Sequence, residues 1–544
     1  MRGNGPWKMA AGVAAIALLA GGCSGGSSDD DETLPNTISI GIVEPDSLVP
    51  SNTTEANGSS VLASIFYPLI RFDDNSNPYT VAAESITHDK ANKVWTIKLR
   101  SGFTFSNGEP VTADNYINAW NYGAYGPNAQ LASYFFSRID GYAQMQSIDP
   151  DGSGPDKASE PKAKKLTGLA KLNDLTFRVT LSAGFSGWES VMGNDSFYPL
   201  PKAAFKSDGV LADGFGDAPI GNGPFKMKGK WEHDSKIVVE KVADFKGTIP
   251  KVDGITWKIY QDLGAQYADL IAGNLDVETK IPIESLASAS GDLGARLQKS
   301  KSSAFSFVGF PLYDKDYQNR DVRRAISMAI NREEMTDQIF LGSETPATSF
   351  VSPVVAGYRA NTCGDNCVYN PTEAKDLYTK ANGPKDLKIS YNADGGHKAW
   401  VDAMCNQIKA SLGVNCTGSP EPKLADLLKK VREHKSVGMI RLAWAMDYPL
   451  MENYLAPLYT TDGSSNYYGY TNTAFDSLVA EGSAAATTQA AQKKWQDAED
   501  ILATDMPVLP LRFGQNVYGF SEKVTNVSMD LFQKVDIYKI EVAS

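Results

Sequence analysis

The sequence predicts an α/β fold, because segments with strand periodicity alternate with segments of helical periodicity along most of the chain. Alternating, β-branched-rich residues predict strands at 37–42, 94–99, 175–181, 255–260 and 508–513. Apolar residues at helical spacing predict helices at 58–70, 265–272, 321–330 and 489–503, and capping chemistry predicts another that begins near Thr112. A chain of 544 residues exceeds one ordinary core, so we expect more than one domain.

Residues 1–22 have the composition of a secretory signal. Two basic residues precede an almost wholly apolar stretch at 9–20, and small residues then lead into Cys23. The apolar stretch is shorter than the roughly 20 residues that a membrane-spanning helix needs. A cysteine in this place predicts bacterial lipoprotein processing, with Cys23 as the lipidated first residue, although Ala20 stands where leucine is usual. The alternative is an ordinary secreted protein in which Cys23 is incidental.

The segment 23–36 is expected to be a tether. Residues 24–32 are glycine, serine and acidic residues with nothing apolar to bury, a composition typical of flexible coil. The net charge is −12, and removal of a signal with two basic residues and no acid makes it two units more negative. Such a charge disfavours a nucleic-acid partner and attraction to an anionic membrane surface, so attachment through a lipid fits better.

Four cysteines remain after the expected lipidation site: Cys363, Cys367, Cys405 and Cys416. In an exported protein they indicate two disulfides, for which three pairings are possible. We expect the local pairs Cys363–Cys367 and Cys405–Cys416. The alternative is a four-thiolate zinc site, which an oxidising compartment disfavours.

The sequence contains no recognisable catalytic motif. There are four histidines, and neither a Gly-x-Ser-x-Gly elbow nor a His-Glu-x-x-His helix is present. His233 lies in a run of adjacent polar residues that would not converge on a helix, so a turn is predicted there. The glycine-rich stretch 220–225 contains Pro224, which removes a backbone donor, and no Lys-Ser/Thr helix follows it. We therefore expect no metal site, no cofactor and no enzymatic activity.

Residues 441–449 are the strongest candidate for a binding site. Arg441, Trp444 and Asp447 follow one another at intervals of three, before the chain-breaking Pro449. An aromatic cluster at 453–459 comes next, and aromatic side chains with a few polar groups commonly line ligand clefts. The alternative is a strand that leads into an ordinary polar turn.

Three stretches identify the family that the chain resembles. They are residues 95–114 (WTIKLRSGFTFSNGEPVTAD), 221–225 (GNGPF) and 321–332 (DVRRAISMAINR). From about Thr37 to its C-terminus, the chain resembles the extracytoplasmic solute-binding proteins of dipeptide and oligopeptide ABC transporters, solute-binding protein family 5. Its tether and later cysteines are similar to those of the BldK-type oligopeptide-binding lipoproteins.

The resemblance implies a two-lobed type II periplasmic-binding-protein fold, with an extra subdomain inserted in lobe I. Lobe I would comprise residues 37–73, 206–303 and 507–544. The inserted subdomain would comprise residues 74–205, and lobe II residues 304–506. The hinge would lie near 306–311 and 507–513.

The resemblance also implies roles for individual side chains. Asp447 would hold the free α-amino group of a peptide ligand, and Trp444 would pack against the ligand. Arg441 and His397 would meet the ligand carboxylate, with the choice set by peptide length. The other expected ligand-binding residues are Asn392, Glu55 and Asn57.

The implied function is that of a lipoprotein on the outer face of the cell membrane. It would capture short peptides and deliver them to the permease subunits of an ABC importer, as a monomer and without a cofactor. The peptide main chain would pair with strand-like backbone of both lobes. The alternatives are the same fold with an oligosaccharide, nickel complex or siderophore as ligand, and a peptide sensor without transport. An extracellular hydrolase is disfavoured by the missing nucleophile and base.

Overall fold

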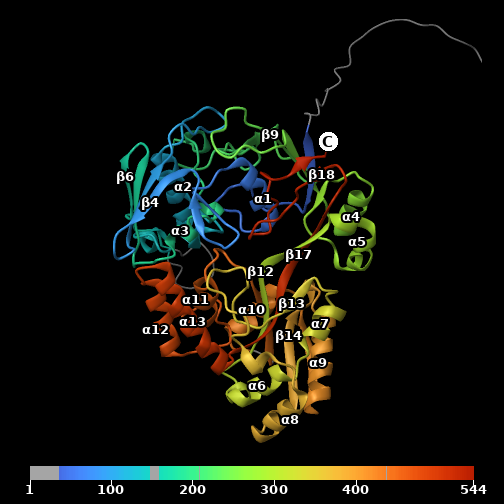
Figure 1. The fold of residues 1–544 in the computed structure, drawn as a ribbon. Coiled ribbons are helices and arrows are strands. Elements are labelled where there is room, and N and C mark those ends of the chain that lie inside the picture. Colours follow the sequence, from blue (N-terminus) through green and yellow to red (C-terminus); the bar gives the residue numbers. More distant parts are fainter. Residues whose placement is uncertain (1–35, 148–158, 208, 436–437, 544) are drawn as a thin grey trace, which may run out of the picture. The chain divides into compact units, whose positions relative to one another are not determined.

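The computed structural model describes residues 36–147, 159–207, 209–435 and 438–543. The expected signal, the lipidation site Cys23 and nearly all of the tether lie outside the described residues. Figure 1 shows two parts of the molecule, one above and one below the centre, with strands β12 and β17 running between them. None of the described helices is long and apolar enough to cross a membrane.

The main sheet has eleven strands within the described chain, in the order β15-β14-β16-β12-β17-β11-β1-β10-β9-β8, with β13 paired to β17. β1 runs parallel to β10 and β11, β14 runs parallel to β15 and β16, and β12 is antiparallel to both β16 and β17. The strands are β1 Thr37–Ile42, β8 Phe225–Met227, β9 Lys236–Lys241, β10 Gly254–Ile259, β11 Val277–Glu278, β12 Leu297–Gly309, β13 Glu344–Pro346, β14 Asp386–Asn392, β15 Asn415–Glu421, β16 Met439–Trp444 and β17 Val508–Phe520.

β12 and β17 are the long central strands, with 13 residues each. Their register shifts between Lys301 and Phe305 and again between Ser306 and Phe307. Such irregularities bend a strand and increase its twist. One end of the pair joins β16 and the other joins β11, so these two strands link the two parts of the molecule. The segments expected to form a hinge fall within and just beyond this pair.

A separate antiparallel sheet has the order β4-β5-β7-β6, with strands Ala83–His88, Val94–Leu99, Thr176–Thr180 and Leu169–Asn173. Helix α2 (Ala113–Ala124) begins after Thr112, whose backbone N–H donates to Asn115 Oδ1 at 2.8 Å. The buried rings of Tyr116 and Trp120 on α2 pack against Phe177 of β7. The short pairs β2–β3 and β18–β19 have the bounds Ile70–Phe72, Pro78–Thr80, Val524–Thr525 and Glu541–Val542.

The remaining helices cover the sheets. They are α1 Ala56–Ile65, α3 Trp188–Val191, α4 Leu263–Ile271, α5 Leu286–Leu293, α6 Arg320–Met328, α7 Arg332–Gln338, α8 Pro371–Lys380, α9 Lys398–Leu412, α10 Leu424–Arg432, α11 Glu452–Tyr459, α12 Thr473–Ser483 and α13 Thr488–Asp505. The helix expected to reach residue 70 ends at Ile65, because the chain becomes extended at Phe66 and then enters β2.

Two disulfides tie the lower part of the molecule. Cys363 is bonded to Cys367, and Cys405 of α9 is bonded to Cys416 of β15. This is the pairing expected from the sequence. The second bond fastens α9 to the edge strand of the main sheet.

Close packing at a helix glycine yields a test of the fold. Gly482 of α12 faces the buried Trp495 of α13, and a Cβ at position 482 would lie 2.6 Å from Trp495 Cδ1. Ala is favoured over Gly in a helix by about 1 kcal/mol, whereas overpacking a core costs about 1–3 kcal/mol. We expect Gly482→Ala to lower the free energy of unfolding in urea denaturation.

The control is Gly291→Ala in α5, where nothing lies within 4 Å of the added carbon. This exposed position should show the helix preference alone and gain stability by up to about 1 kcal/mol. A gain at both positions would contradict the packing of α12 on α13.

Candidate functional site

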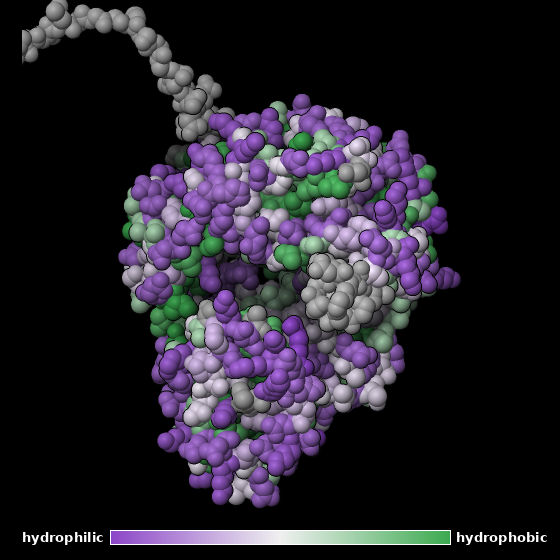
Figure 2. Space-filling model, turned by 180° about the vertical axis from the view of Figure 1, so that it is seen from behind, coloured by the Kyte–Doolittle hydropathy of each residue, from purple (hydrophilic) through white to green (hydrophobic). Residues whose placement is uncertain are grey.

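Two cavities of about 320 and 220 Å³ share one wall. Tyr134, Phe135 and Asp447 line both of them. The smaller one is bounded by the chain entering α1, by Ala445–Asp447 and by the C-terminal residues Phe532–Lys534. Figure 2 shows the surface hollowed between the upper and lower parts of the molecule, with hydrophilic residues around the opening.

Asp447 is held by side chains from two distant parts of the chain. It lies just after β16, and its backbone N–H donates to Oδ1 of Asn453 in α11 at 2.7 Å. The amide of Asn453 donates back to Asp447 Oδ2 at 3.3 Å. The hydroxyl of Tyr134, which lies 313 residues away in the sequence, donates to Asp447 Oδ1 at 3.2 Å. Both carboxylate oxygens therefore accept from neutral donors.

The carboxyl group of Asp447 has no cationic partner among the residues that the structure describes. Burial raises its pKa, the hydrogen bonds from Asn453 and Tyr134 oppose the rise, and the negative charge of Glu452 adds to it. No cationic side chain of the described residues influences this pKa. A buried carboxylate without a counter-ion is costly, so an external cation bound at this position would be strongly stabilised. The arrangement can bind an ammonium group.

The neighbouring charges in the larger cavity are already paired. Glu452 accepts from Arg138 Nη2 at 2.6 Å and from the hydroxyl of Tyr448 at 2.7 Å. The Arg138 guanidinium also lies over the ring of Phe185, 4.0 Å from its centroid. This ion pair crosses from the chain before β6 to α11, so it also joins the two walls of the cavity.

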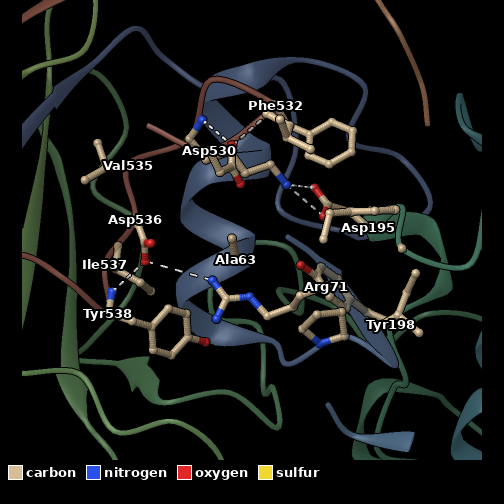
Figure 3. Close-up of a pocket in the computed structure, with 16 residues that line it drawn as sticks. Ala63, Arg71, Asp195, Tyr198, Asp530, Phe532, Val535, Asp536, Ile537 and Tyr538 are labelled. Carbon is tan, nitrogen blue, oxygen red and sulfur yellow. Dashed lines mark hydrogen bonds and ion pairs between the residues drawn. The ribbon is translucent and has the colours of Figure 1, made fainter. Parts of the chain in front are cut away.

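Two charged side chains beside the smaller cavity also form an ion pair. Lys534 Nζ lies 2.9 Å from Asp195 Oδ1, and both side chains are largely buried. They also border a third cavity of about 100 Å³, shown in Figure 3. There the Arg71 guanidinium points toward Asp536 at 3.9 Å and lies over the ring of Tyr538. These pairs connect the C-terminal segment to the rest of the fold.

Trp444, which was expected to pack against a ligand, lies at the wall of two cavities. It lines the 320 Å³ cavity and a further cavity of about 140 Å³, and its side chain is half-buried. The indole N–H donates to Asn453 Oδ1 at 3.5 Å. Asn453 thus positions both Trp444 and Asp447.

Arg441, Asn392 and His397 lie away from Asp447. Arg441 lines the 140 Å³ cavity beside Trp444, and its Nη1 donates to Asn392 Oδ1 at 3.2 Å. His397 is buried beside Trp400, whose indole N–H donates to His397 Nδ1 at 3.1 Å. None of the three expected residues lines the two cavities at Asp447.

Glu55 lines one of the two cavities, whereas Asn57 does not. Glu55 lines the 220 Å³ cavity, but its carboxylate accepts the backbone N–H groups of Asn57 and Gly58 and so caps α1. Burial raises the pKa of Glu55. Asn57 lines neither cavity and accepts the backbone N–H of Val43 at 3.2 Å.

Tyr134 is the site residue that sequence reasoning missed. It lies in a single 3₁₀ turn, Ser133–Phe136, where no apolar periodicity marks it. Its contact with Asp447 depends on the tertiary fold alone. The described residues also contain no group of histidine, cysteine, aspartate and glutamate side chains arranged to hold a metal ion.

The comparisons with known proteins define the class. Residues 77–466 match the model of the bacterial extracellular solute-binding proteins, family 5, so the chain belongs to this family. It is 26% identical to the dipeptide-binding protein DppE of Bacillus subtilis over 485 residues, which cover 86% of this chain and 84% of DppE. It is 24% identical to the oligopeptide-binding protein OppA of Bacillus subtilis, with 93% of this chain and 92% of OppA covered.

The comparison with solved structures identifies the fold. The structure of the murein tripeptide binding protein MppA in its unliganded open form superposes with a TM-score of 0.79 at 20% identity, covering 93% of this chain and 97% of MppA. The protein therefore has the two-lobed fold of periplasmic binding proteins, as the resemblance implied.

The role of Asn453 can be tested without a ligand. The hydrogen bond that its amide donates to Asp447 Oδ2 favours the charged form of Asp447, so we expect Asn453→Ala to raise the pKa of Asp447 further. The measurement is an NMR titration of carbon-13-labelled aspartate, with Asp447→Asn to assign the signal.

Asn472→Ala is the matched control, since Asn472 caps α12 and bonds Asp505 away from the cavities. It should leave the titration of Asp447 unchanged. An unchanged or lowered pKa in Asn453→Ala would show that Asn453 does not stabilise the carboxylate.

Proposed function

We propose that this protein is the lipid-anchored receptor of an ABC importer and that it binds short peptides through their free amino terminus. The observation that carries the proposal is Asp447, a half-buried carboxylate at the junction of two cavities that has no cationic partner among the described residues. An α-ammonium group supplies the missing charge and up to three donors. Removing one member of such a buried pair costs about 2–5 kcal/mol, enough to make the amino terminus a requirement for binding.

The backbone around the smaller cavity suits an extended peptide. The irregular residues at 53–55 and 445–447 bound this cavity from different parts of the chain, and 445–447 continue directly from β16. Main-chain hydrogen bonds to such segments would hold a peptide in the manner of an added strand. Because main-chain pairing ignores side chains, we propose that many peptide sequences bind. The relatives named for dipeptides, oligopeptides and a murein tripeptide support this ligand class.

The far end of the ligand would meet a second set of residues. We propose that Trp444 packs against the peptide and that Arg441 or His397 receives its carboxylate, with Asn392 orienting Arg441. Arg441 and Asp447 are six positions apart, at most about 20 Å of extended chain, so the two ends would suit peptides of a few residues. Glu55 and Asn57 would shape the entry to α1.

The remaining parts of the proposal concern delivery. Lobe I (37–73, 206–303 and 507–544), its inserted subdomain (74–205) and lobe II (304–506) would close on the peptide by bending at β12 and β17. Lipidation of Cys23 would keep the receptor, as a monomer, beside its permease, where its local concentration is high. The tether and cysteine pattern support a place among the BldK-type lipoproteins.

If Asp447 binds the amino terminus, affinity should fall when the charge is removed either from the peptide or from Asp447. Di- to penta-alanine peptides should bind at least tenfold more weakly after N-acetylation, and Asp447→Asn should weaken the free-amine peptides to a similar degree. Isothermal titration calorimetry measures both effects. Asp402→Asn, which removes an exposed charge on α9 outside the cavities, is the control and should bind normally. Equal affinity for free and acetylated peptides would refute the anchor.

The raised pKa of Asp447 predicts a pH dependence. The carboxylate form binds the ammonium, so affinity should fall as the pH drops through the pKa of Asp447, which burial places above that of an exposed aspartate, about 3.9. The affinity ratio between the native protein and Asp447→Asn, measured by calorimetry from neutral to acidic pH, should shrink over this range. A constant ratio would contradict ammonium binding by Asp447.

A further inference from the structure

We infer that Tyr134 is a gate: its hydroxyl donates to an oxygen of Asp447, and the ammonium group of the ligand displaces it. The inference rests on the proposed function, because it assigns Asp447 to the amino terminus of a peptide. It adds a residue that competes with the ligand for the same oxygen.

The position of Tyr134 suits a movable group. The residue lies in the 3₁₀ turn Ser133–Phe136, its ring stacks on Phe135 at a centroid distance of 4.4 Å, and it is 48% exposed. The hydrogen bond to Asp447 holds this exposed ring against the opposite wall. A side chain with so much exposed surface can rotate away without opening a hole in the core.

The hydroxyl and an ammonium group would make equivalent contacts. Each donates a hydrogen bond to Asp447 Oδ1, but the ammonium group also neutralises the carboxylate. The bond from Tyr134 measures 3.2 Å, longer than the 2.5–2.7 Å or so of a strong O–H···O⁻ bond. The existing contact is therefore weak enough for a cation to replace. When no ammonium group is bound, the contact gives this partly buried acceptor a donor.

The same contact divides the binding space. Because Tyr134 and Asp447 line both the 320 and the 220 Å³ cavities, their hydrogen bond lies on the boundary between them. Displacement of Tyr134 would join the two cavities beside the anchored amino terminus. The first residue of a peptide could then place its main chain in one cavity and its side chain in the other.

The tyrosine remains a hydrogen-bond donor at every pH at which peptides bind. Desolvation of the hydroxyl at the cavity wall and the nearby charge of Asp447 raise the pKa of Tyr134 although its ring is partly exposed, so the phenol stays protonated. Only receptor molecules in which the gate is open can bind the ammonium group. The apparent affinity therefore equals the intrinsic affinity multiplied by the fraction of receptor in which the gate is open.

The test is Tyr134→Phe, which keeps the stacked ring and removes only the hydroxyl. We expect the Kd of free-amine alanine peptides to fall by roughly three- to tenfold, as expected when one competing hydrogen bond is lost. Association measured by stopped flow should become faster. N-acetylated peptides, which cannot form the ammonium contact with Asp447, should gain less, so the ratio of free to acetylated affinity should rise.

Tyr142→Phe is the matched control. Its hydroxyl lies 3.1 Å from Ser133 Oγ in the neighbouring turn and outside both cavities, so affinity should not change. Unchanged or weaker binding by Tyr134→Phe overturns the gate, and weaker binding would show that the hydroxyl contacts the ligand instead. If Asp447→Asn weakens binding while Tyr134→Phe does not strengthen it, the gate alone fails. If Asp447→Asn has no effect, the amino-terminal anchor fails and the gate fails with it.

Discussion

The antiparallel pairing of β12 with β17 is the interaction on which the rest of the structure depends. These strands lie at the centre of the eleven-stranded sheet and carry β16 on one flank and β11 on the other. The position of Asp447 follows from them, since β16 is in register with β12 and the chain leaves β16 directly toward the cavities. The shifts in register near Ser306 give the pair a place to bend without losing its hydrogen bonds elsewhere.

The partners of the acidic side chains differ between the site and its surroundings. Glu452 has Arg138, Asp195 has Lys534, and Glu55 has the N-terminus of α1. Glu452 and Asp195 thus have cationic partners, whereas Glu55 accepts hydrogen bonds from the backbone at a helix N-terminus. Asp447 instead receives hydrogen bonds from uncharged groups, and burial shifts its pKa upward. A partly buried acid that accepts hydrogen bonds from neutral groups and has no cationic partner is typical of a binding site for a charged ligand.

Much of the fold could be predicted from the sequence, because many of its strands and helices have recognisable local residue patterns. Strands β1, β5, β7 and β10 and helices α2, α4, α6 and α13 lie within a few residues of the expected ranges. Helix α1 was overextended because apolar spacing continues past Ile65, whereas the chain there turns toward β2. Asp447 and Trp444 were found through a short local stretch. Tyr134 and the pairing of Arg138 with Glu452 were not, since each depends on residues more than 300 positions apart.

The central place of β17 also has a consequence for how the protein is made. Residues 508–520 lie between β12 and β11, so the main sheet cannot close until nearly the whole chain has left the ribosome. Pairings between segments so distant in sequence form slowly. A strand order in which the central partner comes last therefore keeps the main sheet incomplete until the end of synthesis.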